Sequence, residues 1–207
     1  MSPTGRPAKA PKAWRTTSIL WVALALTTAC DRTGAPEPCT LVGASFDAAG
    51  PDDRHLGLGH FLEQQGLRDW RVLAVSGART SELASQLADA ESRCVVIGLS
   101  ISLVEDPQAL LALLESSLPG LEQPWLMQYP PADRLRTPFR FEDYGGDAAA
   151  YNDARSALVE LAMRYNTPLI DAWQDMRPVA DGLHPDAASA RRAAQRVEAA
   201  LGALARP

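Results

Sequence analysis

An alternation of five short apolar runs with longer stretches of helical periodicity constrains the fold of this chain most strongly. Several runs are apolar at successive positions, as expected of strands that are covered on both faces. Strands that alternate with helices favour a parallel sheet between two helical layers. We therefore predict a three-layer α/β/α sandwich with a five-stranded parallel sheet. The predicted strands are residues 39–45, 71–76, 94–100, 125–129 and 168–172, and the predicted helices are residues 56–65, 81–90, 107–117, 148–165 and 190–204.

The first 29 residues have the layout of a bacterial export signal, so they are set aside from the fold. An apolar run at 19–26, too short to span a membrane, is followed by small residues and then by Cys30. The sequence Leu-Thr-Thr-Ala-Cys resembles a lipobox, in which the cysteine is acylated after cleavage; ordinary signal cleavage nearby is the alternative. We expect a signal peptide at 1–29, then a lipidated Cys30 with a polar tether that ends at residue 38. This predicts a periplasmic lipoprotein of the bacterial cell envelope, anchored to the membrane. The basic residues of the signal are Arg6, Lys9, Lys12 and Arg15.

The rest of the chain is acidic. Removing the signal deletes four positive charges and no negative one, so the net charge changes from −5 to −9. No clustered basic stripe is present to neutralise phosphates, which excludes nucleic acid as an expected partner. About 170 residues suffice for one domain with a well-buried core, which we assign to residues 39–207 and expect to be monomeric.

Two cysteines open predicted strands. Cys39 and Cys94 each lie six residues before a serine that ends the same apolar run, Ser45 and Ser100. If the two strands are parallel neighbours, these equal offsets place the cysteines side by side on one face of the sheet. An oxidising compartment allows them to pair. We predict a disulfide, with two buried free thiols as the alternative.

Asp181 and His184 are the residues that indicate chemistry most clearly, together with Ser45. A serine hydroxyl is a poor nucleophile at neutral pH and needs an adjacent base that a third polar group orients. In a tight turn, the carboxylate of Asp181 can reach Nδ1 of His184 and leave Nε2 free to take a proton. The sequence therefore predicts a catalytic triad of Ser45, His184 and Asp181.

Spacing alone does not single out this pair, because Asp52 and His55 have the same separation. These two residues lie in a charged run, and we interpret them as solvated surface. Residues 130–146 show little periodicity and carry Phe139, Phe141 and Tyr144 among prolines and glycines. A loop of this length is usually functional or mobile. It is either a flap that lines the substrate site or a surface excursion whose aromatic side chains pack inward.

At this point the chain resembles the SGNH hydrolases, also called the GDSL esterase and lipase family, over most of the sequence after the signal. The family's first block, usually Gly-Asp-Ser, is Gly43-Ala44-Ser45, which gives Ser45 the nucleophile's place. The fifth block, Asp-x-x-His, is Asp181 to His184, and Pro185 after it is also typical. The resemblance implies a flavodoxin-like SGNH fold and an acyl-enzyme mechanism.

The resemblance also implies an oxyanion hole. The second block puts the backbone N–H of Gly77 there, beside that of Ser45. The third block, usually Gly-x-Asn-Asp, is Gly98-Leu99-Ser100-Ile101, so Ser100 replaces an asparagine whose side-chain amide is a donor in the family. Losing such a donor typically costs about 100- to 1000-fold in turnover. Ser100 either reaches the oxyanion in another way or leaves it to the two backbone groups.

Taken together, these features predict an exported serine ester hydrolase without a metal or organic cofactor. No cysteine and histidine spacing matches a zinc site. The expected substrates are small acyl esters, either O-acetyl groups on carbohydrate or short-chain lipid and aryl esters, and a thioesterase is an alternative. The alternative of another class is a non-catalytic envelope protein that binds carbohydrate and retains the fold.

Overall fold

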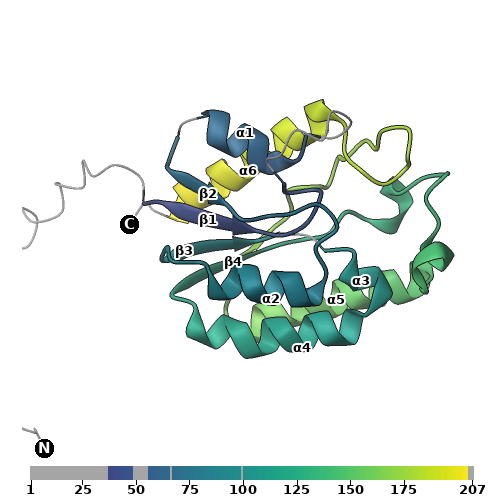
Figure 1. Cartoon of the computed structure of the whole chain (residues 1–207), viewed down its shortest axis with the longest axis horizontal. Helices are drawn as coiled ribbons and strands as arrows, with labels where there is room; N and C mark the ends of the chain where they lie inside the picture. The colour runs from purple at the N-terminus through teal and green to yellow at the C-terminus, as the bar shows by residue number, and fades with distance from the viewer. Residues whose placement is uncertain (1–36, 49–55, 66, 99, 205–207) are drawn as a thin grey trace, which may run out of the picture. The chain divides into compact units, whose positions relative to one another are not determined.

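The computed structural model describes residues 37–48, 56–65, 67–98 and 100–204 (Figure 1). The predicted signal peptide, the predicted lipidation site Cys30 and the pair Asp52 and His55 lie outside the described residues.

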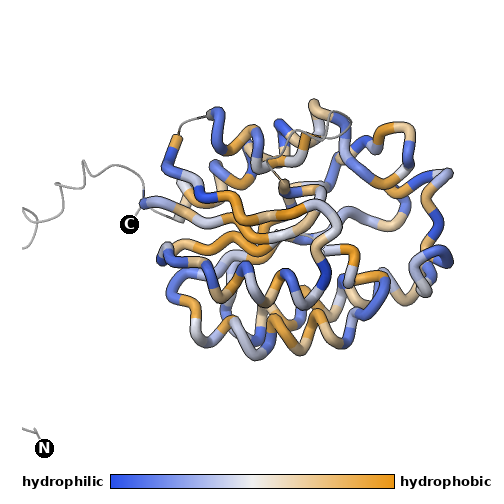
Figure 2. The backbone as a smooth tube through the Cα atoms, in the orientation of Figure 1, coloured by the Kyte–Doolittle hydropathy of each residue, from blue (hydrophilic) through white to orange (hydrophobic). Residues whose placement is uncertain are grey.

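Five parallel strands form a single sheet with the order β2-β1-β3-β4-β5, which confirms the predicted fold class. Side chains of β1 and β3 are buried at all four positions of each strand, as the continuous apolar runs require. Figure 2 shows hydrophobic residues concentrated along the central strands. The strands are β1 (Cys39–Val42), β2 (Trp70–Val72), β3 (Cys94–Ile97), β4 (Gln123–Met127) and β5 (Leu169–Ile170).

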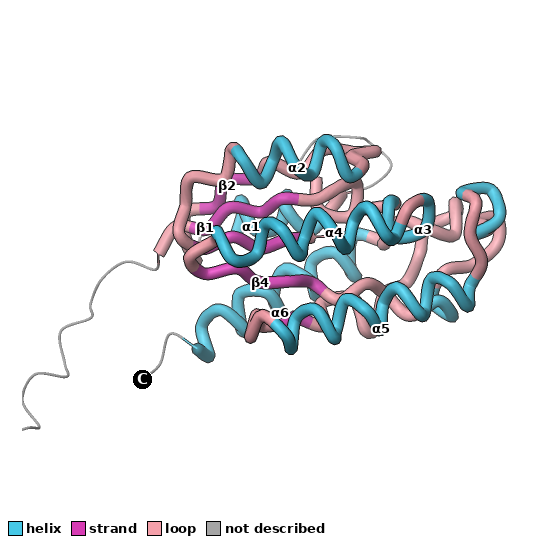
Figure 3. The backbone as a smooth tube through the Cα atoms, turned by 90° about the horizontal axis from the view of Figure 1, so that it is seen from below, coloured by secondary structure: helices cyan, strands magenta, loops and turns pink. Residues whose placement is uncertain are grey.

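Helices cover both faces of this sheet (Figures 1 and 3). α1 (Leu58–Gln65) and α6 (Ala187–Leu204) pack together on one face. The other face carries α2 (Thr80–Ala88), α4 (Pro107–Ser117) and α5 (Ala148–Arg164), together with the short α3 (Ser102–Glu105). Short 3-10 turns lie at Leu118–Gly120, Ala132–Arg134 and Phe141–Tyr144. None of the helices in the described segments is long and apolar enough to cross a bilayer.

Local sequence sets several helix boundaries. Asp106 accepts a hydrogen bond from the N–H of Ala109, and Pro107 occupies the first turn of α4, where its missing N–H is harmless. Asp147 caps α5 in the same way. The inner side of α6 carries buried small residues, Ala190, Ala193 and Ala194, with Val197. Small side chains let this helix lie close to the sheet and to α1.

The two cysteines of the domain form a disulfide between neighbouring strands. Cys39 of β1 is paired in register with Cys94 of β3, and their sulfur atoms are bonded. The prediction of a disulfide is confirmed, and the alternative of two free thiols is wrong. The shared register also sends the segments that carry Ser45 and Ser100 past the same edge of the sheet.

The strand order reverses between β1 and β3, since the chain builds β2 on one side of β1 and β3 to β5 on the other. In open parallel sheets, ligands bind beyond the carboxyl ends of the strands at this reversal. The loops after β1 and β3 are therefore the expected place for a functional site.

Candidate active site

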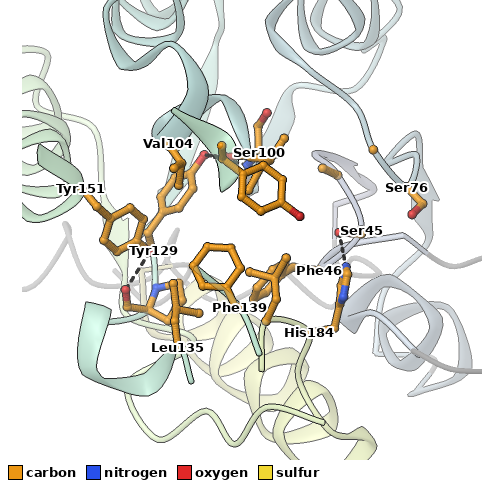
Figure 4. Close-up of a pocket in the computed structure, with 16 residues that line it drawn as sticks. Ser45, Phe46, Ser76, Ser100, Val104, Tyr129, Leu135, Phe139, Tyr151 and His184 are labelled. Atoms are coloured by element: carbon orange, nitrogen blue, oxygen red, sulfur yellow. Dashed lines mark hydrogen bonds between the residues drawn. The ribbon is translucent and has the colours of Figure 1, made fainter. Parts of the chain in front are cut away.

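The structure brings Ser45, His184 and Asp181 together at this edge. Nε2 of His184 lies 2.8 Å from Oγ of Ser45, although the two residues are 139 positions apart in sequence. Nδ1 of His184 lies 2.7 Å from Oδ2 of Asp181. Figure 4 shows this hydrogen bond between Ser45 and His184 among the residues that line a cavity. Both ring nitrogens of the histidine thus have the partners that a serine, histidine and aspartate triad requires.

A tight turn holds Asp181 against its own backbone. Oδ1 accepts hydrogen bonds from the N–H groups of Leu183 and His184, each at 2.9 Å, while Oδ2 faces the imidazole. Burial raises the pKa of Asp181, but the hydrogen bonds from the imidazole and these N–H groups lower it more, so the net pKa is below its usual value. The carboxylate is therefore ionised at neutral pH and able to stabilise an imidazolium.

Gly182 makes this turn possible. Its φ of +75° lies in the left-handed region, and a Cβ at this position would collide with the carbonyl oxygen of Arg136. The carbonyl of Gly182 accepts a hydrogen bond of 2.8 Å from the N–H of Arg136. The turn from Asp181 to His184, called the histidine turn below, is thus hydrogen-bonded to the segment 130–146.

Ser45 lies in a turn directly after β1. The N–H of Asp47 donates to the carbonyl of Ala44 at 2.9 Å, which closes the turn around the serine. The side-chain amide of Gln86, on α2, makes two hydrogen bonds with the backbone of Gly43. The N–H of Gly43 donates to Oε1 at 2.7 Å, and Nε2 donates to the carbonyl of Gly43 at 3.0 Å. The start of this turn is therefore held by a buried side-chain amide from α2, and the side chain at position 44 is a methyl group that makes no hydrogen bond.

Asp47 is a second residue that the sequence did not single out. Its carboxylate is fully buried and lies against Gly43 and Gly98, where an added Cβ would collide with Oδ2. This contact explains why glycine is needed at the start of the third block. The position of Asp47, two residues after Ser45, is a signal in the sequence that could have identified it as part of the site. Nothing in the sequence indicated that Gln86 supports the site.

The sequence predicts that the backbone N–H groups of Ser45 and Gly77 form the oxyanion hole. Ser45 and Gly77 both line the cavity, and Gly77 has a φ of +78°. Within the described part of the chain, neither N–H has a hydrogen-bond acceptor. Both groups can therefore donate to a bound oxygen.

Ser100 is close by but has other hydrogen-bond partners. Its hydroxyl donates to the carbonyl of Ala78 at 2.9 Å and accepts from the N–H of Ser102. Its own N–H donates to the hydroxyl of Tyr129 at 2.6 Å, which in turn donates to the carbonyl of Ser100. Both hydrogens that Ser100 could offer are therefore already donated to other groups in this structure.

A cavity of about 200 Å³ opens beside Ser45 and His184. Part of its wall comes from the segment 130–146, through Leu135, Phe139 and Tyr144. The rings of Phe139 and Tyr144 stack with centroids 5.5 Å apart. The segment therefore lines the cavity, and its aromatic residues also pack on one another.

The described residues contain no group of three or more histidine, cysteine or carboxylate side chains placed to hold a metal ion.

The chain matches no protein-family model and no curated protein. Solved structures do resemble it. A lipase/acylhydrolase from Enterococcus faecalis has a TM-score of 0.62 at 15% identity, with 81% of this chain and 96% of that chain covered. An acetylxylan esterase from Geobacillus stearothermophilus has a TM-score of 0.57 at 16% identity, with coverages of 82% and 95%. An α/β hydrolase enzyme from the metagenome of Lake Arreo, Spain, has a TM-score of 0.57 at 18% identity, with coverages of 82% and 97%.

At such identities the likeness establishes the fold. The shared α/β fold spans nearly the whole length of each of these proteins.

Proposed function

We propose that this protein is an exported serine ester hydrolase of the SGNH type. The observation that carries the proposal is the continuous hydrogen-bonded row from Ser45 Oγ through His184 to Asp181. The esterases and acylhydrolases that share the fold support the same class of reaction.

In the proposed mechanism, Oγ of Ser45 attacks the acyl carbonyl while Nε2 of His184 takes the hydroxyl proton. Asp181 holds the imidazole in the tautomer that accepts this proton and stabilises the imidazolium that forms. The backbone N–H groups of Ser45 and Gly77 stabilise the oxyanion. His184 then protonates the leaving alcohol, and a water molecule repeats the cycle on the acyl-enzyme. We do not assign an oxyanion donor to Ser100, since its hydrogens are committed elsewhere.

The test is hydrolysis of p-nitrophenyl butyrate by the purified protein and its Ser45→Ala variant. Loss of Ser45 should reduce kcat by at least about 1000-fold. Ser156→Ala, which changes an exposed serine on α5, is the matched control and should leave the rate unchanged. Labelling by a fluorophosphonate probe should modify the peptide that contains Ser45. Equal background rates for the wild type and Ser45→Ala would instead favour the non-catalytic binding protein.

We also propose that the chain reaches the cell envelope as a lipoprotein acylated at Cys30. The export layout of residues 1–29 supports this location. Metabolic labelling of bacterial cells with an alkyne fatty acid should tag the wild type and not Cys30→Ala. A wild-type protein without label, found in the soluble periplasmic fraction, would contradict the anchor.

A further inference from the structure

The cavity beside the triad differs in chemistry from a carbohydrate site. Among the described residues that line it, the polar side chains are those of His184, three serines and three tyrosines. None of the lining side chains carries a carboxylate, ammonium, guanidinium or carboxamide group. Sugar hydroxyls require polar partners at fixed positions. Much of the lining is instead aliphatic and aromatic, and it includes Ile101, Val104, Leu135 and Phe139.

Tyr129 and Tyr151 present mainly their rings to this cavity, because their hydroxyls are occupied. The hydroxyl of Tyr129 bonds the backbone of Ser100, and that of Tyr151 donates to the carbonyl of Pro130 at 2.8 Å. Burial raises the pKa of both tyrosines, so both are neutral. Their ring centroids lie 6.4 Å apart in an edge-to-face arrangement, which makes a continuous aromatic wall.

The residues that line the two sides of the cavity differ in burial. Figure 4 shows Tyr129, Tyr151 and Leu135 at the side opposite Ser45 and His184. Val104, Tyr129 and Tyr151 are all buried, whereas Ser76 at the catalytic side is exposed. The leaving alcohol must lie next to Nε2 of His184 to receive its proton. The acyl chain is then the part of the substrate that extends toward the buried apolar side of the cavity.

We propose, resting on the proposed function, that this cavity binds the acyl chain and selects straight or aromatic acyl groups of about six to eight carbons. An apolar cavity of about 150 Å³ holds a benzene ring, so about 200 Å³ accommodates a group of this size. An acetyl group leaves most of this volume unfilled. The protein therefore acts on apolar acyl esters in preference to O-acetyl groups on carbohydrate.

The first experiment compares p-nitrophenyl esters from acetate to dodecanoate, in which the leaving group is constant. Burying one methylene is equivalent to about a fourfold change, so kcat/KM should rise about fourfold per methylene from acetyl to hexanoyl and stop rising beyond octanoyl. A second series of acetate esters with alcohols of increasing length should show a much smaller rise. Acetylated xylo-oligosaccharide should be a poorer substrate than the hexanoyl ester.

A variant tests whether this cavity is the cause. Leu135→Trp fills part of the apolar end from a half-buried position, and it should lower the ratio of kcat/KM for hexanoyl to that for acetyl by about tenfold. Leu121→Trp is the matched control, because Leu121 is also half-buried against the core but does not line this cavity. The control should leave that ratio unchanged.

The outcomes separate this inference from the proposed function. If every ester is hydrolysed equally by the wild type and Ser45→Ala, the proposed function fails and the inference fails with it. If hydrolysis depends on Ser45 but acetyl esters are preferred, or the alcohol series alone shows the rise, the enzyme stands and the acyl assignment is overturned. An unchanged chain-length ratio in folded Leu135→Trp overturns it as well.

Discussion

Replacing Asp181 by asparagine tests the triad with little change in shape. In the structure, Oδ1 accepts the N–H groups of Leu183 and His184, so this position must keep an oxygen. The asparagine amide is then forced to place its NH₂ group toward the imidazole, where Oδ2 stood. A donor facing Nδ1 requires Nδ1 to accept. The proton moves to Nε2, which can no longer take the proton of Ser45.

The expected loss of activity is large and the expected loss of stability is small. The corresponding change in a serine protease triad lowers kcat by about 10,000-fold, which is about 5 kcal/mol of transition-state stabilisation. The folded state keeps both backbone hydrogen bonds in Asp181→Asn. Asp181→Ala removes their acceptor as well, so it should unfold more easily than the asparagine variant by about 1 kcal/mol.

The assay measures kcat for p-nitrophenyl hexanoate and urea unfolding for both Asp181 variants. Asp153→Asn, an exposed carboxylate on α5, is the control for the substitution itself and should behave as wild type. The double variant Asp181→Asn/His184→Ala should be no slower than His184→Ala, because the two residues act as one unit. More than a tenth of the wild-type kcat in Asp181→Asn would refute the reasoning that this carboxylate sets the tautomer.

Three further outcomes are expected. Cys39→Ala/Cys94→Ala should lose about 4 kcal/mol of unfolding free energy, since the bridge closes a loop with a sequence separation of 55; a loss below about 1 kcal/mol in urea titration would contradict this. A hydrogen bond from Arg196 is the main cause that lowers the pKa of Asp175 from 3.8 to about 2. The ionised Asp175 therefore stabilises the folded state above pH 3.8, and this contribution is lost as pH falls toward about 2. Since the side chain is 44% exposed, Asp175→Asn should lower the unfolding free energy by under about 1 kcal/mol at pH 7. The difference in unfolding free energy between this variant and the wild type should shrink between pH 3.8 and about 2. Gly182→Ala should cost at least about 1 kcal/mol and lower kcat, as measured by urea unfolding and ester hydrolysis, whereas a variant equal to wild type would show that the turn tolerates a side chain.

The sheet could be predicted from the sequence because its strands are buried on both faces. Short runs such as Cys94–Ile97, which alternate with longer helical stretches, favour covered strands. The equal spacing of Cys39 and Cys94 from their serines predicted their pairing if the two strands were parallel neighbours, and the structure confirms this register. The predicted strands extend beyond the observed ones at their carboxyl ends, because the apolar runs continue into the loops that carry the site. The short α3 was missed, since four residues are too few to show a helical period.

The supporting contacts of the site could not be predicted in the same way. Gln86 lies in a helical stretch with no chemical signature, and only packing of α2 on β1 brings its amide to Gly43. The partners of Ser100 depend on Tyr129, which is 29 residues away at the end of another strand. Motif spacing identifies groups capable of chemistry. It does not show which hydrogen bonds those groups already make.

The segment 130–146 connects substrate binding to the position of the base. Leu135 and Phe139 line the acyl cavity, while Arg136 between them donates its N–H to Gly182, two residues before His184. The carbonyl of His184 in turn accepts the N–H of Val179, so the histidine turn is held on both sides. A side chain that fills the cavity therefore presses on the same segment that fixes the imidazole. We therefore expect discrimination between acyl chains in kcat as well as in KM, because a chain that moves this segment would also move the imidazole that must accept the serine proton.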